Sequence, residues 1–324
     1  GMHKGNEFAG KVALVTGAAR NIGRAIALSL AAGGATVAVN TRSKIAEARG
    51  VVDEIKALGA DGEAYAADVA EPAQVQAMID AVLKRFGRLD ILVLNAAVRE
   101  HVHFDEISYD DWRRILATNL DSAFVFTKAC LPALKQAGDG RIVTFAGVTA
   151  LLGLKDRVHV AASKHGIVGL TKVAALEGAE HGVTANAICP GYVWTPLVEK
   201  QIPDQMKSRN MTEEQVKRDV LLAAQPTKQF VTIEQVAALA LARQGATALV
   251  EINPHAFPSD MLGESQRNVT RLLTETIPEI AARRLGGAMQ RTNILRDLVA
   301  DAGLGRVYLP DSSFVAAGFG PDEL

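Results

Sequence analysis

A glycine-containing turn, with the helix predicted after it, is the first feature of the sequence suited to ligand chemistry. Residues 12–15 (VALV) form an apolar run short enough for a buried strand, which Thr16 and Gly17 end at a tight turn. Apolar residues then recur at helical spacing from Ile22, so the first free N–H groups of a helix point back over the turn, where they suit a diphosphate. Gly17 lets backbone approach such a ligand, and Gly23 lets the helix lie close to the strand. A strand, turn and helix with incidental glycines is the alternative.

The residues after the second predicted strand bear on the identity of the nucleotide. Folds specific for NAD place an acidic side chain there to bind the ribose hydroxyls. This chain has Asn40 and Arg42 instead, and Arg20 lies in the glycine-containing turn. Two guanidinium groups suit a 2′-phosphate, so NADP(H) is favoured over NAD(H), although arginines are also common on protein surfaces.

Composition narrows the class of partner. A chain of 324 residues, 48% hydrophobic and 22% charged, predicts one or two globular domains. The net charge of −1 predicts neither nucleic-acid nor membrane binding, which leaves small molecules. Cys130 and Cys189 lack metal-ligand spacing, so buried free thiols and no metal site are expected. The sequence shows neither a long apolar run nor a charged-then-apolar leader, which predicts a cytoplasmic protein.

Strands and helices alternate along most of the chain. We expect strands at 12–15, 35–40, 64–67, 89–94, 141–145 and 184–188, and helices between them at 44–58, 71–86, 112–134 and 160–181. The helix at 112–134 is expected to break near Pro132. This order predicts a Rossmann-like α/β fold, a doubly wound parallel sheet with helices on both faces and a ligand crevice beyond the carboxyl ends of the strands.

The segment at 195–232 is amphipathic and is expected to be helical in two pieces, with Pro203 and Pro226 as breaks. Its length and its position before the expected last strand, possible at 247–252, predict a lid over the crevice. We therefore expect a Rossmann-type domain over 8–250 and a mainly helical C-terminal extension over 251–324.

From about residue 11 to 241 the chain resembles the short-chain dehydrogenase/reductase family. The turn is similar to that family's T-G-x-x-x-G-x-G loop, with Asn21 at the middle glycine. Residues 94–97 (LNAA) are similar to the family's N-N-A-G segment, with Leu94 and Ala97 as departures. TPLVEKQI, from Thr195, is similar to the corresponding segment of 3-hydroxybutyrate dehydrogenases, and 3-oxoacyl carrier-protein reductases are the other group it resembles. The resemblance implies a homodimer or homotetramer and a cofactor site made of Thr16, Gly17, Arg20, Asn21, Ile22, Gly23, Asn40, Arg42, Asp68, Val69, Asn95, Ala96, Lys164, Pro190, Gly191 and Thr195.

The same resemblance assigns two members of the family's catalytic group, Asn119 and Lys164. In that group a tyrosine beside the lysine protonates the developing alkoxide, a serine holds the substrate oxygen, and the asparagine keeps a water chain behind the lysine. The tyrosine position falls on Val160 and the serine position on Gly147, and neither residue can donate a proton. General acid catalysis typically contributes about 10²–10⁴ in rate, so ordinary turnover is in doubt. His159 is adjacent, but one step along a helix turns a side chain about 100° away from the pocket.

Positions that face the substrate in hydroxybutyrate dehydrogenases also differ here. Thr149, Arg157 and Arg99 stand where those enzymes carry a histidine, a lysine and a glutamine, and only Gln201 keeps the residue type. A small carbonyl or alcohol is therefore the expected substrate class, without a closer identification.

The C-terminal text resembles a second family. RRLGGAMQRTNILRDLVADAGLGRVYLP, from Arg283, is similar to the second aspartate-rich segment of squalene and phytoene synthases. Asp297 and Asp301 are four residues apart, so their carboxylates could share Mg²⁺ on one helix face, and a solvated helix face is the alternative.

Three functions are compatible with these patterns. The favoured one is an NADP(H)-dependent oxidoreductase for a small carbonyl or alcohol. The second is a catalytically silent nucleotide-binding protein that serves as a scaffold or sensor. The third is prenyl-transfer chemistry in the tail.

Overall fold

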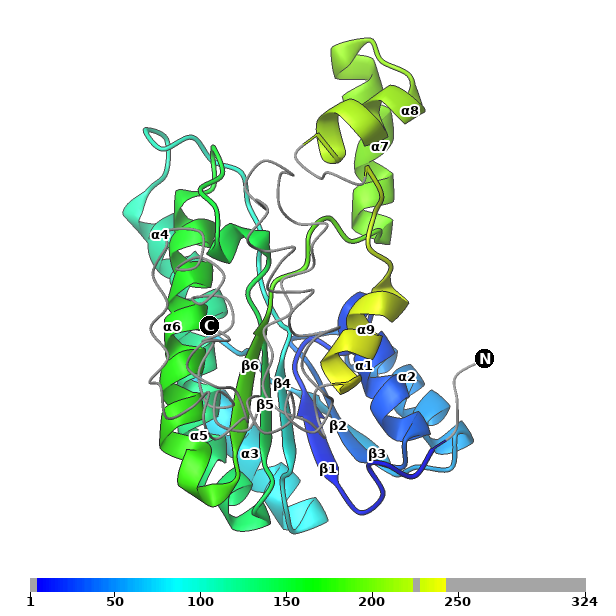
Figure 1. The fold of residues 1–324 in the computed structure, drawn as a ribbon, viewed down its shortest axis with the longest axis vertical. Coiled ribbons are helices and arrows are strands. Elements are labelled where there is room, and N and C mark those ends of the chain that lie inside the picture. Colours follow the sequence, from blue (N-terminus) through cyan, green and yellow to red (C-terminus); the bar gives the residue numbers. More distant parts are fainter. Residues whose placement is uncertain (1–4, 224–227, 243–324) are drawn as a thin grey trace, which may run out of the picture.

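Six parallel strands form the centre of the protein, as described for residues 5–223 and 228–242 by a computed structural model. Their order is β3-β2-β1-β4-β5-β6 (Figure 1), which confirms the predicted Rossmann-like sheet. The strands are β1 (Val12–Val15), β2 (Thr36–Thr41), β3 (Gly62–Ala66), β4 (Ile91–Leu94), β5 (Arg141–Phe145) and β6 (Thr184–Ile188). Chain order reverses direction across the sheet between β1 and β4, and in such sheets the ligand crevice lies beyond the strand ends at that point.

Helices cover both faces of the sheet because the strand side chains alternate between them. In β1, Ala13 and Val15 join a core with α1 (Asn21–Ala32), α2 (Ile45–Ala57) and α9 (Ile233–Ala242). Val12 and Leu14 join the opposite core with α3 (Pro72–Phe86), α5 (Ser122–Ala137) and α6 (Val158–Gly178), as Figure 1 shows. Short helical turns η2 (Val148–Ala150) and η3 (Ala179–His181) flank α6 in the sequence.

The expected break near Pro132 is wrong. The chain is helical from α4 (Tyr109–Leu116) through the π-helical turn η1 (Ala117–Asp121) and along α5, with Pro132 inside α5. Buried Phe126, Cys130 and Leu134 hold α5 against the sheet, and this packing outweighs the one hydrogen bond that a proline removes. The irregularity falls instead at η1, the kind of turn that is frequent at functional sites.

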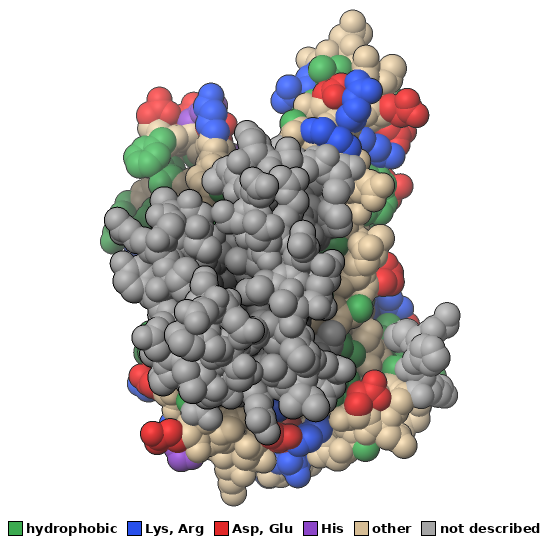
Figure 2. Space-filling view, viewed as in Figure 1, with side chains coloured by type: hydrophobic (Ala, Val, Ile, Leu, Met, Phe, Trp, Pro, Cys, Tyr) green, Lys and Arg blue, Asp and Glu red, His purple; other side chains and the backbone are tan. Residues whose placement is uncertain are grey.

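The segment predicted as a lid projects from the end of the sheet (Figure 1). Here α7 (Pro196–Arg209) runs through Pro203, so the predicted break there is also wrong. Pro203 is exposed, while buried Val198 and Ile202 anchor the helix. Beyond α7 come α8 (Glu213–Gln215) and η4 (Val216–Leu221), and basic and acidic side chains intermingle on this projection (Figure 2).

Several expectations fall outside the described residues: the break at Pro226, the strand at 247–252, and the extension over 251–324 with Asp297 and Asp301. Cys130 and Cys189 are both buried, as predicted. Within residues 5–223 and 228–242, every helix is too short or too polar to cross a bilayer.

Candidate functional site

A cleft of about 600 Å³ opens at the carboxyl ends of the strands. Its walls come from the β1–α1 turn, the segments after β2, β4, β5 and β6, and the first turns of α6. Most of the predicted site residues line it: Gly17, Arg20, Asn21, Ile22, Asn40, Arg42, Asp68, Val69, Asn95, Ala96, Gly147, Val160, Lys164, Pro190, Gly191 and Thr195. Thr16, Gly23 and Asn119 are not among the residues that line it, and Thr16 and Asn119 border a smaller cavity instead.

The β1–α1 turn has the backbone that its glycines predict. Gly17 has φ +62°, and Asn21 takes the middle glycine position at φ +50°, a conformation that asparagine tolerates. A Cβ atom on Gly23 would lie 2.4 Å from the Gly17 carbonyl oxygen and 2.7 Å from Asn95 Nδ2, so this position excludes a side chain. Within the described part of the chain, helix α1 begins with neither a side-chain cap nor an acidic residue in its first turn, which leaves the helix N-terminus suited to an anion.

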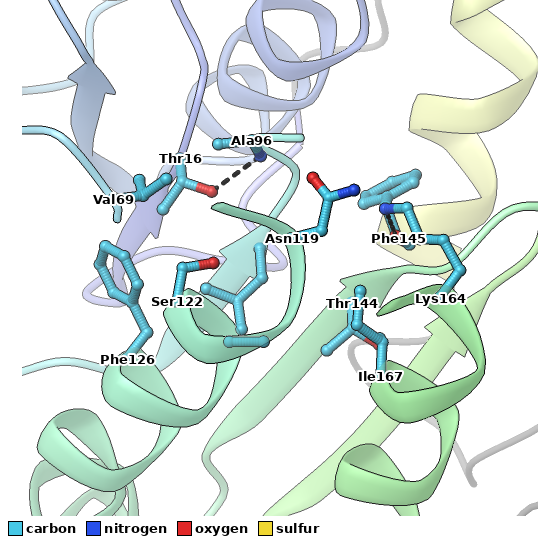
Figure 3. Close-up of a pocket in the computed structure, with 12 residues that line it drawn as sticks. Thr16, Val69, Ala96, Asn119, Ser122, Phe126, Thr144, Phe145, Lys164 and Ile167 are labelled. Carbon is cyan, nitrogen blue, oxygen red and sulfur yellow. Dashed lines mark hydrogen bonds between the residues drawn. The ribbon is translucent and has the colours of Figure 1, made fainter. Parts of the chain in front are cut away.

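Two polar side chains, buried Thr16 and half-buried Asn95, fix this turn against the end of β4. Thr16 Oγ1 accepts hydrogen bonds at 3.0 Å from the backbone N–H groups of Asn95 and Ala96, and Figure 3 shows the second of these. Asn95 Nδ2 donates to the carbonyl oxygens of Thr16 and Gly17 at 3.1 and 3.2 Å. The side chains of Thr16 and Asn95 therefore position the turn.

The end of β2 contributes one structural and several charged residues. Asn40 is buried, accepts a hydrogen bond from the Gly17 N–H at 3.3 Å and donates one to the Ala67 carbonyl at 3.1 Å, so its side chain is committed to the backbone. Arg20 and Arg42 are exposed at this end of the cleft. Lys44, which the sequence analysis missed, joins them there. The sequence Arg-Ser-Lys directly after β2 places Lys44 two residues from Arg42 and could have predicted its position in the cleft.

Lys164 and Asn119 both border a small cavity beside the cleft, and Lys164 also lines the cleft itself. Lys164 Nζ donates to the Phe145 carbonyl at 2.6 Å. Burial, assisted by the positive charge of Arg99, lowers the pKa of Lys164 to about 8. Asn119 accepts from the Val98 N–H at 2.8 Å and donates to the Val98 carbonyl at 2.9 Å. Both side chains border a cavity of about 10 Å³ beside Phe145 (Figure 3), roughly the space of one water molecule.

The two positions expected to carry hydroxyl groups lie at the same wall. Val160 and Gly147 line the cleft with Lys164. Gly147 has φ +75°, and a Cβ atom there would meet nothing closer than Thr149 Oγ1 at 3.7 Å. A side chain at this position therefore has space but a strained backbone.

His159 lies next to Val160 in the sequence but away from the cleft. Its side chain is fully buried and is not among the residues that line the cleft. Neither ring nitrogen has a hydrogen-bond partner within the described part of the chain. Burial is the main cause that lowers the pKa of His159, which favours the neutral ring.

At the far end of the cleft lie Arg99, Arg157, Thr149 and Tyr192. Gln201, by contrast, is exposed on α7 and does not line the cleft. Among the described residues, no cluster of three or more His, Cys, Asp or Glu side chains is arranged to hold a metal ion.

Comparison with known proteins adds family evidence to this geometry. Residues 11–206 match the short chain dehydrogenase family, and residues 260–324 match the squalene/phytoene synthase family. The chain is 46% identical to the D-beta-hydroxybutyrate dehydrogenase of Rhizobium meliloti strain 1021 over 74% of this chain and 93% of that protein. It is 38% identical to the 3-oxoacyl (acyl-carrier-protein) reductase FabG of Staphylococcus aureus strain N315, over 63% and 82% of the two chains.

A solved structure shares the fold. It is a protein of Sinorhizobium meliloti 1021, provisionally described as a short-chain alcohol dehydrogenase. The two structures agree with a TM-score of 0.64 at 31% identity, over 72% of this chain and 88% of that one.

Proposed function

This chain belongs to the short-chain dehydrogenase family, and from that premise we propose that it is an NADP(H)-dependent oxidoreductase of a small carbonyl or alcohol. The family comprises oxidoreductases that bind NAD(P)(H). One observation carries the proposal: a single cleft joins the uncapped N-terminus of α1 to the buried amine of Lys164.

The residues at the α1 end fit a dinucleotide. A side chain at Gly23 would collide with backbone, and a Cβ atom on Gly17 would lie 3.1 Å from Ala96 Cα, so glycine at both positions keeps the turn tight enough for close approach by a diphosphate. In the proposed complex the N–H groups of Asn21 and Ile22 bind the diphosphate, and Arg20 and Arg42 bind a 2′-phosphate. The remaining cofactor contacts come from Asp68, Val69, Ala96, Pro190, Gly191 and Thr195, which line the same cleft.

Hydride transfer is the chemistry that the bound nicotinamide supplies, and the chain must manage the accompanying proton. Lys164 is mostly protonated at neutral pH, because its pKa is about 8, and Asn119 borders the small cavity beside it. With Val160 and Gly147 unable to donate, we propose that water beside Lys164 delivers the proton. Turnover is then slow, since a positioned acid typically contributes about 10²–10⁴ in rate.

The second candidate is a catalytically silent nucleotide-binding protein, a scaffold or sensor. The absence of a hydroxyl group at Val160 and Gly147 favours it, while the nucleotide end of the cleft serves it equally well.

A reductase assay beside a binding titration separates the two candidates. NADPH and NADH are titrated into the full chain by fluorescence, and NADPH oxidation is then followed with a panel of small aldehydes and ketones. Tight NADPH binding with slow turnover supports the oxidoreductase, whereas binding without turnover on any carbonyl supports the silent protein. If neither nucleotide binds, both candidates are wrong.

We also propose that the protein pairs with copies of itself through α5 and α6, as a homodimer or homotetramer. Phe124 on α5 and Val173 and Leu176 on α6 are each more than half exposed, at 56%, 54% and 56%. Exposed apolar side chains on two helices that pack together suit an interface. Light scattering on the eluting protein, with Val173→Glu as the disrupting variant, tests this assembly.

A further inference from the structure

Most of the charged side chains that line the cleft are basic, although the chain as a whole is nearly neutral at a net charge of −1. Among the described residues, the basic ones that line it are Arg20, Arg42, Lys44, Arg99, Arg157 and Lys164, against one acidic residue, Asp68. The proposed nucleotide accounts for the group around Arg42 and for Lys164. It leaves Arg99 and Arg157, at the opposite end, without an assigned ligand.

Arg157 is the more enclosed of these two side chains. It is half-buried, and its Nη2 atom contacts His101 Nε2. Burial lowers the pKa of the Arg157 guanidinium, and the positive charge of Arg99 contributes in the same direction, against an opposing contribution from Tyr192. Both effects mean that the protein itself disfavours this charge at this place.

Nearby carboxylates are engaged elsewhere. Asp156 pairs with His103 Nδ1 at 2.8 Å, and Glu100 pairs with Arg114 at 2.6 Å. Within the described residues, neither Arg99 nor Arg157 forms an ion pair with a carboxylate. Two mutually repelling guanidinium groups that face one cleft without an acidic partner favour a ligand that brings the negative charge.

We propose that the substrate carries two negative charges, as a dicarboxylate or a phosphorylated carbonyl compound, bound by Arg157 and Arg99. A guanidinium binds carboxylate or phosphate oxygens in a two-pronged geometry, so two of them can engage two anionic charges, whereas a monocarboxylate leaves one unused. Arg157 is the stronger anchor because its surroundings exclude more water than those of exposed Arg99. The inference rests on the proposed function for the reaction, but binding tests it without turnover.

Calorimetric titration of the cofactor-free full chain with three non-reacting probes provides the test. Succinate and butyrate have the same number of carbons and differ by one carboxylate, and glycerol 3-phosphate represents a phosphorylated ligand. We expect one of the two dianions to bind at least about 10-fold more tightly than butyrate. The preferred dianion identifies the anionic group of the substrate.

Variants locate the binding site. Arg157→Gln should weaken the preferred dianion roughly 10- to 100-fold, Arg157→Lys less, and exposed Arg99→Gln roughly 3- to 10-fold. Arg113→Gln removes an exposed arginine of α4 outside the cleft and should leave the affinity unchanged. Far-UV circular dichroism checks the fold of each variant, and Arg99→Gln keeps the test valid if Arg157→Gln unfolds.

Two results would overturn the proposal. One is butyrate binding as tightly as both dianions. The other is a loss of dianion affinity in Arg42→Gln together with unchanged affinity in Arg157→Gln and Arg99→Gln. That result would place the bound anion at the nucleotide end of the cleft. Because these titrations contain no cofactor, their failure would leave an observed NADPH affinity intact, so the two proposals fail separately.

Discussion

The two ends of the cleft are built in different ways. The nucleotide end consists mainly of backbone: the turn through Gly17, the N-terminus of α1, and a helix approach that Gly23 makes possible. The far end depends on side chains, and the two positions to which the family resemblance assigns hydroxyl groups are Gly147 and Val160 in this sequence. A binding site made of backbone N–H groups tolerates changes of side chain. General acid catalysis, by contrast, depends on one side-chain oxygen or nitrogen atom that donates the proton. A chain of this family can therefore keep its nucleotide site after its chemistry weakens.

Asn119 and Lys164 are compatible both with an active enzyme and with a silent nucleotide-binding protein. Asn119 makes two hydrogen bonds to the backbone of Val98, and Lys164 is bonded to the Phe145 carbonyl. Each ties one element to another, so each has a structural reason to persist without catalysis. Their presence therefore does not separate an enzyme from a silent protein, and experiments on each end of the cleft must do so.

Restoring the proton donor should have the largest effect. Val160 lines the cleft, so Val160→Tyr places a phenol beside Lys164 and should raise kcat for carbonyl reduction by about 10² or more. Val160→Phe adds the same ring without the hydroxyl and is the matched control. Gly147→Ser should add little, because φ +75° costs a side chain about 1–3 kcal/mol. Equal rates in the tyrosine and phenylalanine variants would contradict the assignment of Val160 to the position of the family's catalytic tyrosine.

The pH dependence of the free energy of unfolding tests whether the amine of Lys164, which lies between the two ends of the cleft, is buried. The pKa of Lys164 is depressed to about 8 from 10.5, so below pH 8 the folded protein carries a disfavoured charge, and this penalty disappears as pH rises toward 10.5. Relative to Lys164→Met, the free energy of unfolding should rise by on the order of 2 kcal/mol between pH 8 and 9.5. Denaturant titrations of the two proteins measure this, and Cys130, whose pKa burial raises, cancels because both contain it. Parallel curves would mean that the amine is solvated.

Adding a side chain at Gly23, where there is no room for one, should damage the nucleotide end of the cleft. Gly23→Ala forces a Cβ atom against the Gly17 carbonyl, so NADPH affinity should fall at least about 10-fold and the free energy of unfolding by about 1–3 kcal/mol. Gly50→Ala, in an open position on α2, should leave binding unchanged and add up to about 1 kcal/mol of stability. Fluorescence titration and thermal melting provide both measurements. Unchanged NADPH binding in Gly23→Ala would separate the turn from the nucleotide site.

The smallest expected effect concerns the choice between the two nucleotides. Arg42→Gln should weaken NADPH about 10-fold at low salt and leave NADH unchanged, because exposed Arg42 is assigned to the 2′-phosphate. Arg49→Gln, exposed on α2 outside the cleft, is the control. An equal loss for both nucleotides would assign Arg42 to a part that the two share.

Local patterns in the sequence predicted the sheet and the turn, whereas most of the residues that line the cleft came from the family resemblance. Strands and amphipathic helices are predicted by apolar residues that recur with periods of two and 3.6 residues. Glycine indicates positions where only backbone fits. The six strands were all anticipated, although β3 begins at Gly62, before its apolar residues. The breaks at Pro132 and Pro203 were wrong because tertiary packing decides whether a helix survives one proline.

By itself the sequence determined the parallel sheet, the glycine-containing turn and the absence of hydroxyl groups at Val160 and Gly147, because these follow from residue type and neighbours in the chain. Tertiary structure alone decided that Asn40 bonds the Gly17 backbone, that Gly147 has φ +75°, and that Arg99 and Arg157 face one cleft without a carboxylate partner among the described residues. These properties join residues distant in sequence, and their energies depend on burial and on the groups that folding brings alongside.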